Sequence, residues 1–76
     1  MRYGGDSQQQ VLALLLENKD GMTVDELAGT VGLSRSGINQ NLMVLEREGY
    51  ARRGGTRRTG GRPQHVYVLT EAGTNL

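Results

Sequence analysis

A glycine-rich segment with five arginines and no acidic residue, Ala51 to His65, most limits how this chain can fold. It follows a helical pattern that ends at Gly49, and it precedes an apolar run, Val66–Leu69, that is typical of a strand. We therefore expect a short strand over Tyr50–Arg53, a glycine-rich loop, and an antiparallel return over His65–Leu69. The segment is predicted to form an exposed, positively charged β-hairpin.

Charge is unevenly distributed along the chain. Residues 1–50 carry four basic and seven acidic residues, whereas residues 51–76 carry five basic residues and one acidic residue. The formal net charge of +1 hides this asymmetry, which indicates a polyanionic partner. Eight of the nine cations are Arg, which can bind phosphate groups and guanine edges bidentately. The alternative is a solvated loop whose charges only aid solubility.

The length of 76 residues indicates one small domain, whose core must come from Leu, Val, Ile, Met and Tyr because Phe and Trp are absent. The lack of cysteine excludes disulfides and iron–sulfur clusters, and a single histidine argues against a zinc site, so no metal or other cofactor is expected. No apolar run approaches the roughly 18 residues of a membrane span, and the first residues do not resemble a signal peptide. We expect a soluble cytoplasmic protein without membrane contact.

Capping signals divide the chain into helices. Residues 1–6 are predicted to be a flexible leader, and residues 7–76 a single domain. Asp6 or Ser7 is expected to cap a first helix that runs to about Lys19. The Thr23–Glu26 capping box begins a second helix, which ends at Gly32.

Ser34 is expected to cap a third helix, from about Arg35 to Glu48. Ile38, Leu42 and Leu45 form its apolar stripe. A minimal strand at Met22–Thr23 and a last helical turn capped by Thr70 complete the predicted α+β fold of three helices and a two-stranded hairpin.

The third helix carries polar side chains opposite its apolar stripe, as a DNA-reading helix requires. The candidates are Ser34, Arg35, Ser36, Asn39, Gln40 and Met43. Asn and Gln can pair with adenine, and Arg with guanine. The alternative is an ordinary polar face in a small helical bundle, and this segment alone leaves both interpretations open.

Four segments of the sequence together indicate a family resemblance: Thr23–Ala28, Val31–Ser34, Leu42–Tyr50 and Gly61–Gly73. They resemble the winged helix-turn-helix transcriptional regulators of MarR, ArsR and DeoR type, over nearly the whole chain. The wing is also similar to that of repressors of iron–sulfur cluster assembly. The resemblance implies a third helix in the major groove and a hairpin wing on the DNA backbone or minor groove. The chain departs from the iron–sulfur repressors because it lacks their cysteine region, and from MarR-like proteins because it lacks long terminal helices for dimerisation.

The wing supplies further candidate DNA contacts. Arg57 and Arg58 are predicted to contact phosphates. The run of Gly60, Gly61, Arg62 and Pro63 resembles the core of an AT-hook, in which the Arg enters the minor groove; the alternative is a stiff Pro that ends a flexible loop. Thr23 lies at a helix N-terminus and could hold a phosphate, although its capping role suffices to explain it.

Signals of catalysis are weak, and we expect no enzyme. The spacing of Gly55 and Gly60 matches a P-loop, but Gly61 and Arg62 follow instead of Lys and Ser or Thr, and a strand follows instead of a helix. His65 has no carboxylate near it in the sequence.

The predicted function is sequence-specific binding of double-stranded DNA by a transcriptional regulator, as a homodimer on a palindromic site. Leu14, Val44 or the Val66 and Val68 face could form the dimer interface. No small-molecule effector is evident. The rival interpretation is a winged-helix module for protein–protein interaction in a larger assembly. RNA binding is a third possibility, for which only Tyr50 lies near the wing as a stacking group.

Overall fold

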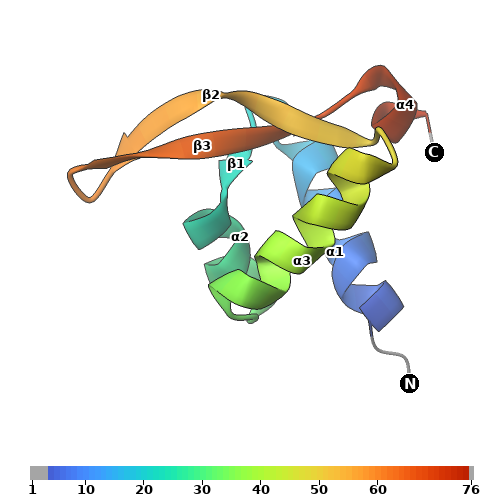
Figure 1. The fold of residues 1–76 in the computed structure, drawn as a ribbon, viewed down its shortest axis with the longest axis horizontal. Helices are drawn as coiled ribbons and strands as arrows, with labels where there is room; N and C mark the ends of the chain where they lie inside the picture. Colours follow the sequence, from blue (N-terminus) through green and yellow to red (C-terminus); the bar gives the residue numbers. More distant parts are fainter. Residues whose placement is uncertain (1–3, 76) are drawn as a thin grey trace.

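The fold packs three helices against one side of a three-stranded antiparallel sheet, and the hairpin of the last two strands extends beyond the helices (Figure 1). This computed structural model describes residues 4–75. The elements follow in the order α1 (Gly4–Glu17), β1 (Met22–Thr23), α2 (Val24–Val31), α3 (Arg35–Arg47), β2 (Ala51–Thr59), β3 (Arg62–Leu69) and α4 (Glu71–Thr74). The expected α+β class, the three helices and the minimal strand β1 are therefore confirmed.

Helix α1 differs from the prediction at both ends. It begins at Gly4, so neither Asp6 nor Ser7 is its cap, and it ends at Glu17 instead of Lys19. At this end the side-chain amide of Asn18 donates to the Leu14 carbonyl oxygen at 2.8 Å, beside the helical bond from the Asn18 backbone N–H at 2.9 Å. Of the leader expected over residues 1–6, residues 4–6 are helical, and residues 1–3 lie outside the described residues.

The predicted caps of the later helices are confirmed. The Glu26 backbone N–H donates to Thr23 Oγ1 at 3.2 Å, and the Thr23 backbone N–H donates to Glu26 Oε1 at 3.0 Å, which completes the capping box of α2. Ser34 Oγ accepts from the Gly37 N–H at 3.1 Å, at the start of α3. Such caps satisfy backbone donors that would otherwise lack partners, and each contributes about 1 kcal/mol.

The core lies between the helices and the inner face of the sheet. It consists of Val11, Leu15, Met22, Leu27, Ile38, Leu42, Leu45, Ala51 and Tyr67. Gly21 joins α1 to the sheet with φ at +95°, and a Cβ there would lie only 2.8 Å from the Tyr67 carbonyl oxygen. A larger residue at Gly21 would therefore force the sheet away from the first helix.

The structure differs most from the sequence-based prediction in the hairpin, whose strands are longer than expected. A loop was expected between Arg53 and His65, but β2 and β3 pair continuously from Ala51↔Leu69 to Thr59↔Arg62, with one register shift at Gly54. Only Gly60 and Gly61 form the turn, with φ of +57° and +85°. Two central residues with positive φ match the right-handed twist of a hairpin, and two glycines adopt this geometry without steric cost. The turn signal thus outweighs the low strand propensity of the glycines in this segment.

Candidate nucleic-acid interface

Helix α3 presents two chemically different faces. Ile38, Leu42 and Leu45 are buried in the core. Ser34, Arg35, Ser36, Asn39, Gln40 and Met43 are exposed. Met43 is 61% exposed, which is unusual for a large apolar side chain, and it lies within the polar stripe. The predicted separation of an apolar stripe from a polar stripe on this helix is confirmed, and the polar stripe faces solvent.

The basic residues of the hairpin fall into two groups. Arg57 and Arg53 face acidic residues of the helices: Arg57 Nη1 lies 2.7 Å from Glu26 Oε1, and Arg53 Nε lies 3.9 Å from Glu46 Oε2. Arg58 and Arg62 are exposed, and within residues 4–75 neither forms an ion pair. Arg52, at the base of the hairpin, is also exposed and forms no ion pair among these residues. Three of the five arginines, two of them beside the turn, are therefore available to an external anion.

The register of the ladder decides which way these side chains point. Arg57 pairs with Gln64, Arg58 with Pro63, and Thr59 with Arg62. Because side chains alternate between the two faces of a strand, Arg62 shares a face with Gln64, and Arg58 lies on the opposite face. Proline is tolerated at position 63 because β1 pairs with β3 only at Val66 and Tyr67, so Pro63 has no ladder partner on that side.

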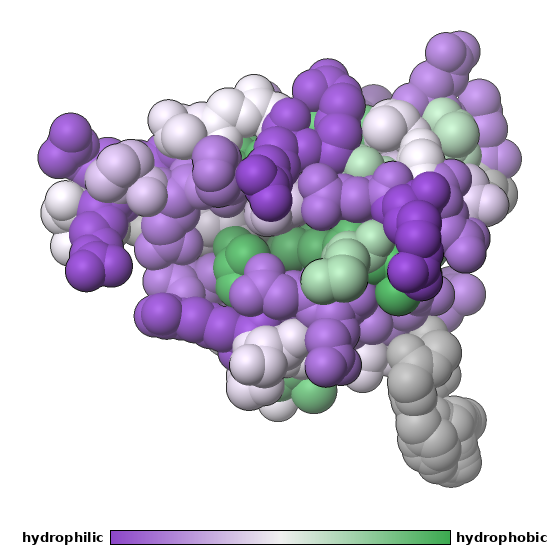
Figure 2. Space-filling model, in the orientation of Figure 1, coloured by the Kyte–Doolittle hydropathy of each residue, from purple (hydrophilic) through white to green (hydrophobic). Residues whose placement is uncertain are grey.

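A cleft separates the hairpin from the helix-turn-helix. It is lined by Val24, Asp25, Arg35, Asn39, Gly60, Arg62 and Gln64. The structure thus brings together Arg35 and Asn39 of α3 and Arg62 of the wing, although 23 residues separate Asn39 from Arg62. Figure 2 shows hydrophilic residues over much of the hairpin and helix surface on one face of the molecule, with a narrow hydrophobic band between them.

The structure does not support the predicted phosphate contact by Thr23. Its relative exposure is 0%, and its hydroxyl oxygen already accepts the Glu26 N–H. The side chain is a helix cap, as the capping box indicated, and it has no surface to offer to a phosphate.

A model of the winged helix-turn-helix DNA-binding family matches residues 6–52, more than half of the chain. The chain belongs to this family. The family is one of DNA-binding domains and not of enzymes. The resemblance of the sequence to winged helix-turn-helix proteins is thereby confirmed. No curated protein matches the chain in sequence.

Solved structures share the fold of this winged helix-turn-helix domain. A mutant of MepR from multidrug-resistant S. aureus is 22% identical, with a TM-score of 0.77, and the match covers 92% of this chain and 50% of that protein. A MarR family regulator from Neisseria meningitidis is 17% identical, with a TM-score of 0.76 over 91% of this chain and 46% of its own. A further S. aureus MepR mutant, bound to an oligodeoxyribonucleotide, is 23% identical, with a TM-score of 0.75 over 91% and 49%. The chain therefore spans about half the length of these proteins.

Three polar residues were not predicted as site residues from the sequence: Asp25 and Gln64, which line the cleft, and Glu26, which follows Asp25 in the first turn of α2. Asp25 Oδ1 lies 2.6 Å from Arg35 Nε, and Asp25 Oδ2 accepts from Gln64 Nε2 at 2.8 Å. The two acids were interpreted only as part of the capping box of α2. The sequence signal for these contacts was the presence of two acidic residues in a chain with an arginine-rich hairpin. That signal does not say which hairpin residue each acid binds, because this depends on the register of the strands.

The Glu26 carboxyl is held in its ionised form. The hydrogen bond from the Thr23 backbone N–H lowers the pKa of Glu26 most, partial burial opposes this effect, and the hydrogen bond and charge of Arg57 lower the pKa further. The Glu26 carboxylate is therefore ionised at neutral pH, where it accepts from the Arg57 guanidinium.

The described residues form neither a metal site nor a membrane-spanning helix. Within residues 4–75, no three His, Asp or Glu side chains gather in a way that could hold a metal ion. None of the described helices combines the length and apolar character that crossing a bilayer would need.

Proposed function

We propose that this domain binds double-stranded DNA in a sequence-specific manner and regulates transcription. In this proposal α3 enters the major groove, and the hairpin tip lies on the neighbouring backbone or in the minor groove. The observation that supports it most is the shared cleft, because Arg35, Asn39 and Arg62 border one hollow between the helix and the wing. A DNA duplex placed against this hollow would meet side chains from both elements at once.

Base recognition is assigned to the exposed stripe of α3. Arg35 suits a guanine edge, Asn39 and Gln40 suit an adenine edge, and Ser36 can pair with either. Met43, exposed in the same stripe, offers an apolar surface to a thymine methyl group. The ion pair between Arg35 and Asp25 is an exposed one and therefore weak, so a guanine or a phosphate can replace the carboxylate.

Backbone contact is assigned to the tip of the wing. Arg58 and Arg62 are exposed on opposite faces of the hairpin, and Gly60, Gly61 and Pro63 keep the tip narrow between them. Arg62 faces the cleft and is the candidate for the minor groove, whereas Arg58 is a candidate for a phosphate. Each phosphate contact would release counterions and make binding dependent on salt.

We also propose a homodimer that acts on a palindromic site in the cytoplasm. An apolar groove between α1 and the end of β3 supports this, with Leu12, Ala13, Leu16 and Leu69 in its lining. Leu16 is 47% exposed, and exposed apolar grooves mark interaction surfaces. This groove is a better candidate interface than Val66, which is buried, or than Leu14 and Val44, which are half-buried.

Fluorescence anisotropy tests the function directly. A random duplex of about 30 base pairs, long enough for two half-sites about one helical turn apart, is titrated with the protein at several salt concentrations. We expect micromolar binding that weakens steeply as salt rises. Absence of binding at low salt by the folded protein would contradict the proposal and favour a protein–protein interaction module.

A further inference from the structure

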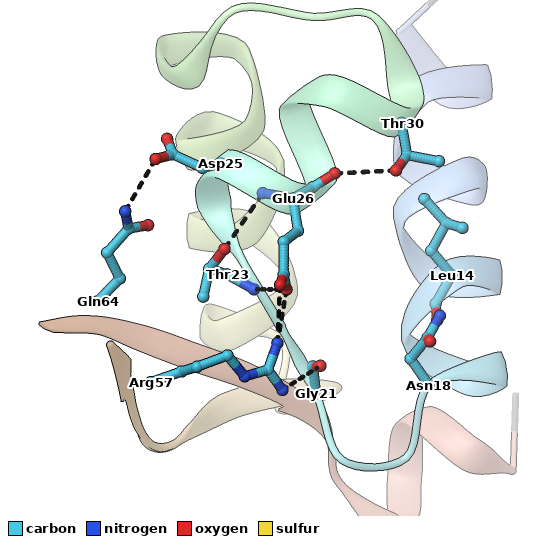
Figure 3. A network of polar contacts seen from close by, with 9 residues as sticks. All are labelled: Leu14, Asn18, Gly21, Thr23, Asp25, Glu26, Thr30, Arg57 and Gln64. Atoms are coloured by element: carbon cyan, nitrogen blue, oxygen red, sulfur yellow. Dashed lines mark hydrogen bonds and ion pairs between the residues drawn. The ribbon is translucent and has the colours of Figure 1, made fainter. Parts of the chain in front are cut away.

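The first turn of α2 holds both strands of the wing. Glu26 Oε1 and Oε2 accept from Arg57 Nη1 of β2 at 2.7 and 2.9 Å, and the next acid, Asp25, accepts from Gln64 of β3 at 2.8 Å (Figure 3). Arg57 and Gln64 are direct cross-strand partners. Two consecutive residues of one helix therefore bind two opposed residues of the hairpin, on the same face of the ladder.

We propose that these four residues, Asp25, Glu26, Arg57 and Gln64, form a clamp that positions the wing relative to α3 for DNA binding. Arg57 is then a positioning residue and not a phosphate contact, which replaces its role expected from the sequence. The inference rests on the proposed function, since it assigns the clamp a task in DNA recognition.

The place of the clamp along the hairpin suits this role. Two further residue pairs, Arg58↔Pro63 and Thr59↔Arg62, separate it from the turn. Two-stranded hairpins are marginally stable and twist strongly when nothing packs against them. An anchor near the tip therefore restricts where Arg58 and Arg62 can lie.

The clamp also reaches the reading helix. Asp25 contacts Gln64 through Oδ2 and Arg35 through Oδ1, so one carboxylate joins β3 to the first residue of α3. The two surfaces that the proposed DNA site combines are thereby tied to each other through the first turn of α2.

Electrostatics argue against a direct DNA contact by Arg57. Its Nη2 also donates to the Gly21 carbonyl oxygen at 3.2 Å, so the guanidinium is held by two segments of the chain. Its side chain is only 36% exposed. Turning Arg57 towards a phosphate would leave the ionised Glu26 carboxylate without its partner and close to a polyanion, which is unfavourable.

The salt dependence of DNA binding separates the two roles of arginine in the wing. Arg57→Gln removes the clamp, and Arg58→Gln is the matched control, because it removes the same charge from the neighbouring residue on the opposite face. Both are titrated on the same duplex as the wild type, over a salt series. For Arg58→Gln we expect the salt slope to fall by about 0.9. For Arg57→Gln we expect an unchanged slope and affinity about two- to fivefold lower, as for the loss of a half-exposed ion pair.

Amide hydrogen exchange without DNA tests the clamp independently of the proposed function. Exchange over Thr56–His65 should be faster in Arg57→Gln and unchanged in Arg58→Gln. Glu26→Gln is the second clamp variant, and it keeps the capping box because Gln is also accepted at this position. It should likewise accelerate exchange over Thr56–His65. This variant keeps the test possible if Arg57→Gln does not fold.

The outcomes are distinct. A salt slope lowered by Arg57→Gln as much as by Arg58→Gln would overturn the positioning role, because Arg57 would then be a phosphate contact. Unchanged hairpin exchange in both clamp variants would also overturn the proposal. If the wild type binds no DNA, the proposed function fails, whereas the exchange data still decide whether the clamp holds the wing.

Discussion

The helical part of the domain and the hairpin wing satisfy their polar groups over very different distances. In the helical part, Thr23 with Glu26 and Ser34 with Gly37 are pairs three residues apart. In the wing, Arg57 binds Glu26 across 31 residues, and Gln64 binds Asp25 across 39. The caps of the helices are thus specified by local contacts, whereas the polar contacts that hold the wing join residues far apart in the sequence.

The helical part and the hairpin wing also differ in how deeply their side chains are buried. Leu27, Ile38 and Leu42 of the helical part are 0–1% exposed, whereas every arginine of the hairpin except Arg57 is exposed. Apolar burial therefore stabilises the helices and the base of the sheet, and the outer hairpin contributes little to the core. We expect substitutions in the two regions to separate stability from DNA binding.

The largest effect is expected from Leu27→Ala, which breaks the better packed region. Leu27 is 0% exposed, so its truncation leaves a cavity and should lower the free energy of unfolding by about 3 kcal/mol. Chemical denaturation measures the loss. Met43→Ala is the matched control, because Met43 is 61% exposed, lies outside the proposed dimer groove, and should lose less than about 1 kcal/mol. Equal losses would contradict the assignment of the core.

Asn39→Ala comes next, and it sharpens the comparison by separating base reading from stability. Asn39 is exposed, so the free energy of unfolding should change little. Discrimination at one or two base pairs should fall by about 1–3 kcal/mol, the worth of a good bidentate contact. Affinities for the preferred site and for its single-base variants measure the effect. Equal weakening on preferred and random DNA would argue against base reading by Asn39.

Ser34→Ala tests the local character of the helical part. The substitution removes the acceptor of the Gly37 N–H and should lower stability by about 1 kcal/mol. Ser34→Asp keeps an acceptor at this position and should retain most of the stability, as measured by thermal unfolding. If both variants unfold at the same temperature as the wild type, the cap contributes nothing to stability.

The smallest effect concerns pH and the wing. Because the pKa of Glu26 lies below its usual value of 4.5, its stabilising contribution is complete above that value and is lost as pH falls through the lowered pKa. The resonances of the Thr23 amide and the Arg57 guanidinium, which both donate to the Glu26 carboxyl, should thus shift below about pH 4.5 in an NMR titration. Glu26→Gln should remove this step. A step of equal size in that variant would assign the titration to another group.

Much of the fold could be predicted from local patterns. The capping box at Thr23 and Glu26, the cap at Ser34 and the buried stripe of Ile38, Leu42 and Leu45 are all present as expected. These signals are reliable because each acts within one helical turn. The hairpin was predicted at the right place but with strands that were too short, because the two-residue turn at Gly60 and Gly61 was interpreted as part of a longer loop.

The sequence by itself determined the second and third helices with their caps, the basic character of the wing and the family to which the domain belongs. Only the tertiary structure decided that Arg57 faces Glu26, that Arg62 faces α3, and that Thr23 is buried. The physical reason is the ladder register: each step of one residue reverses the face to which a side chain points. Which arginines meet the helices and which meet solvent therefore follows from the packing of the hairpin on the first turn of α2.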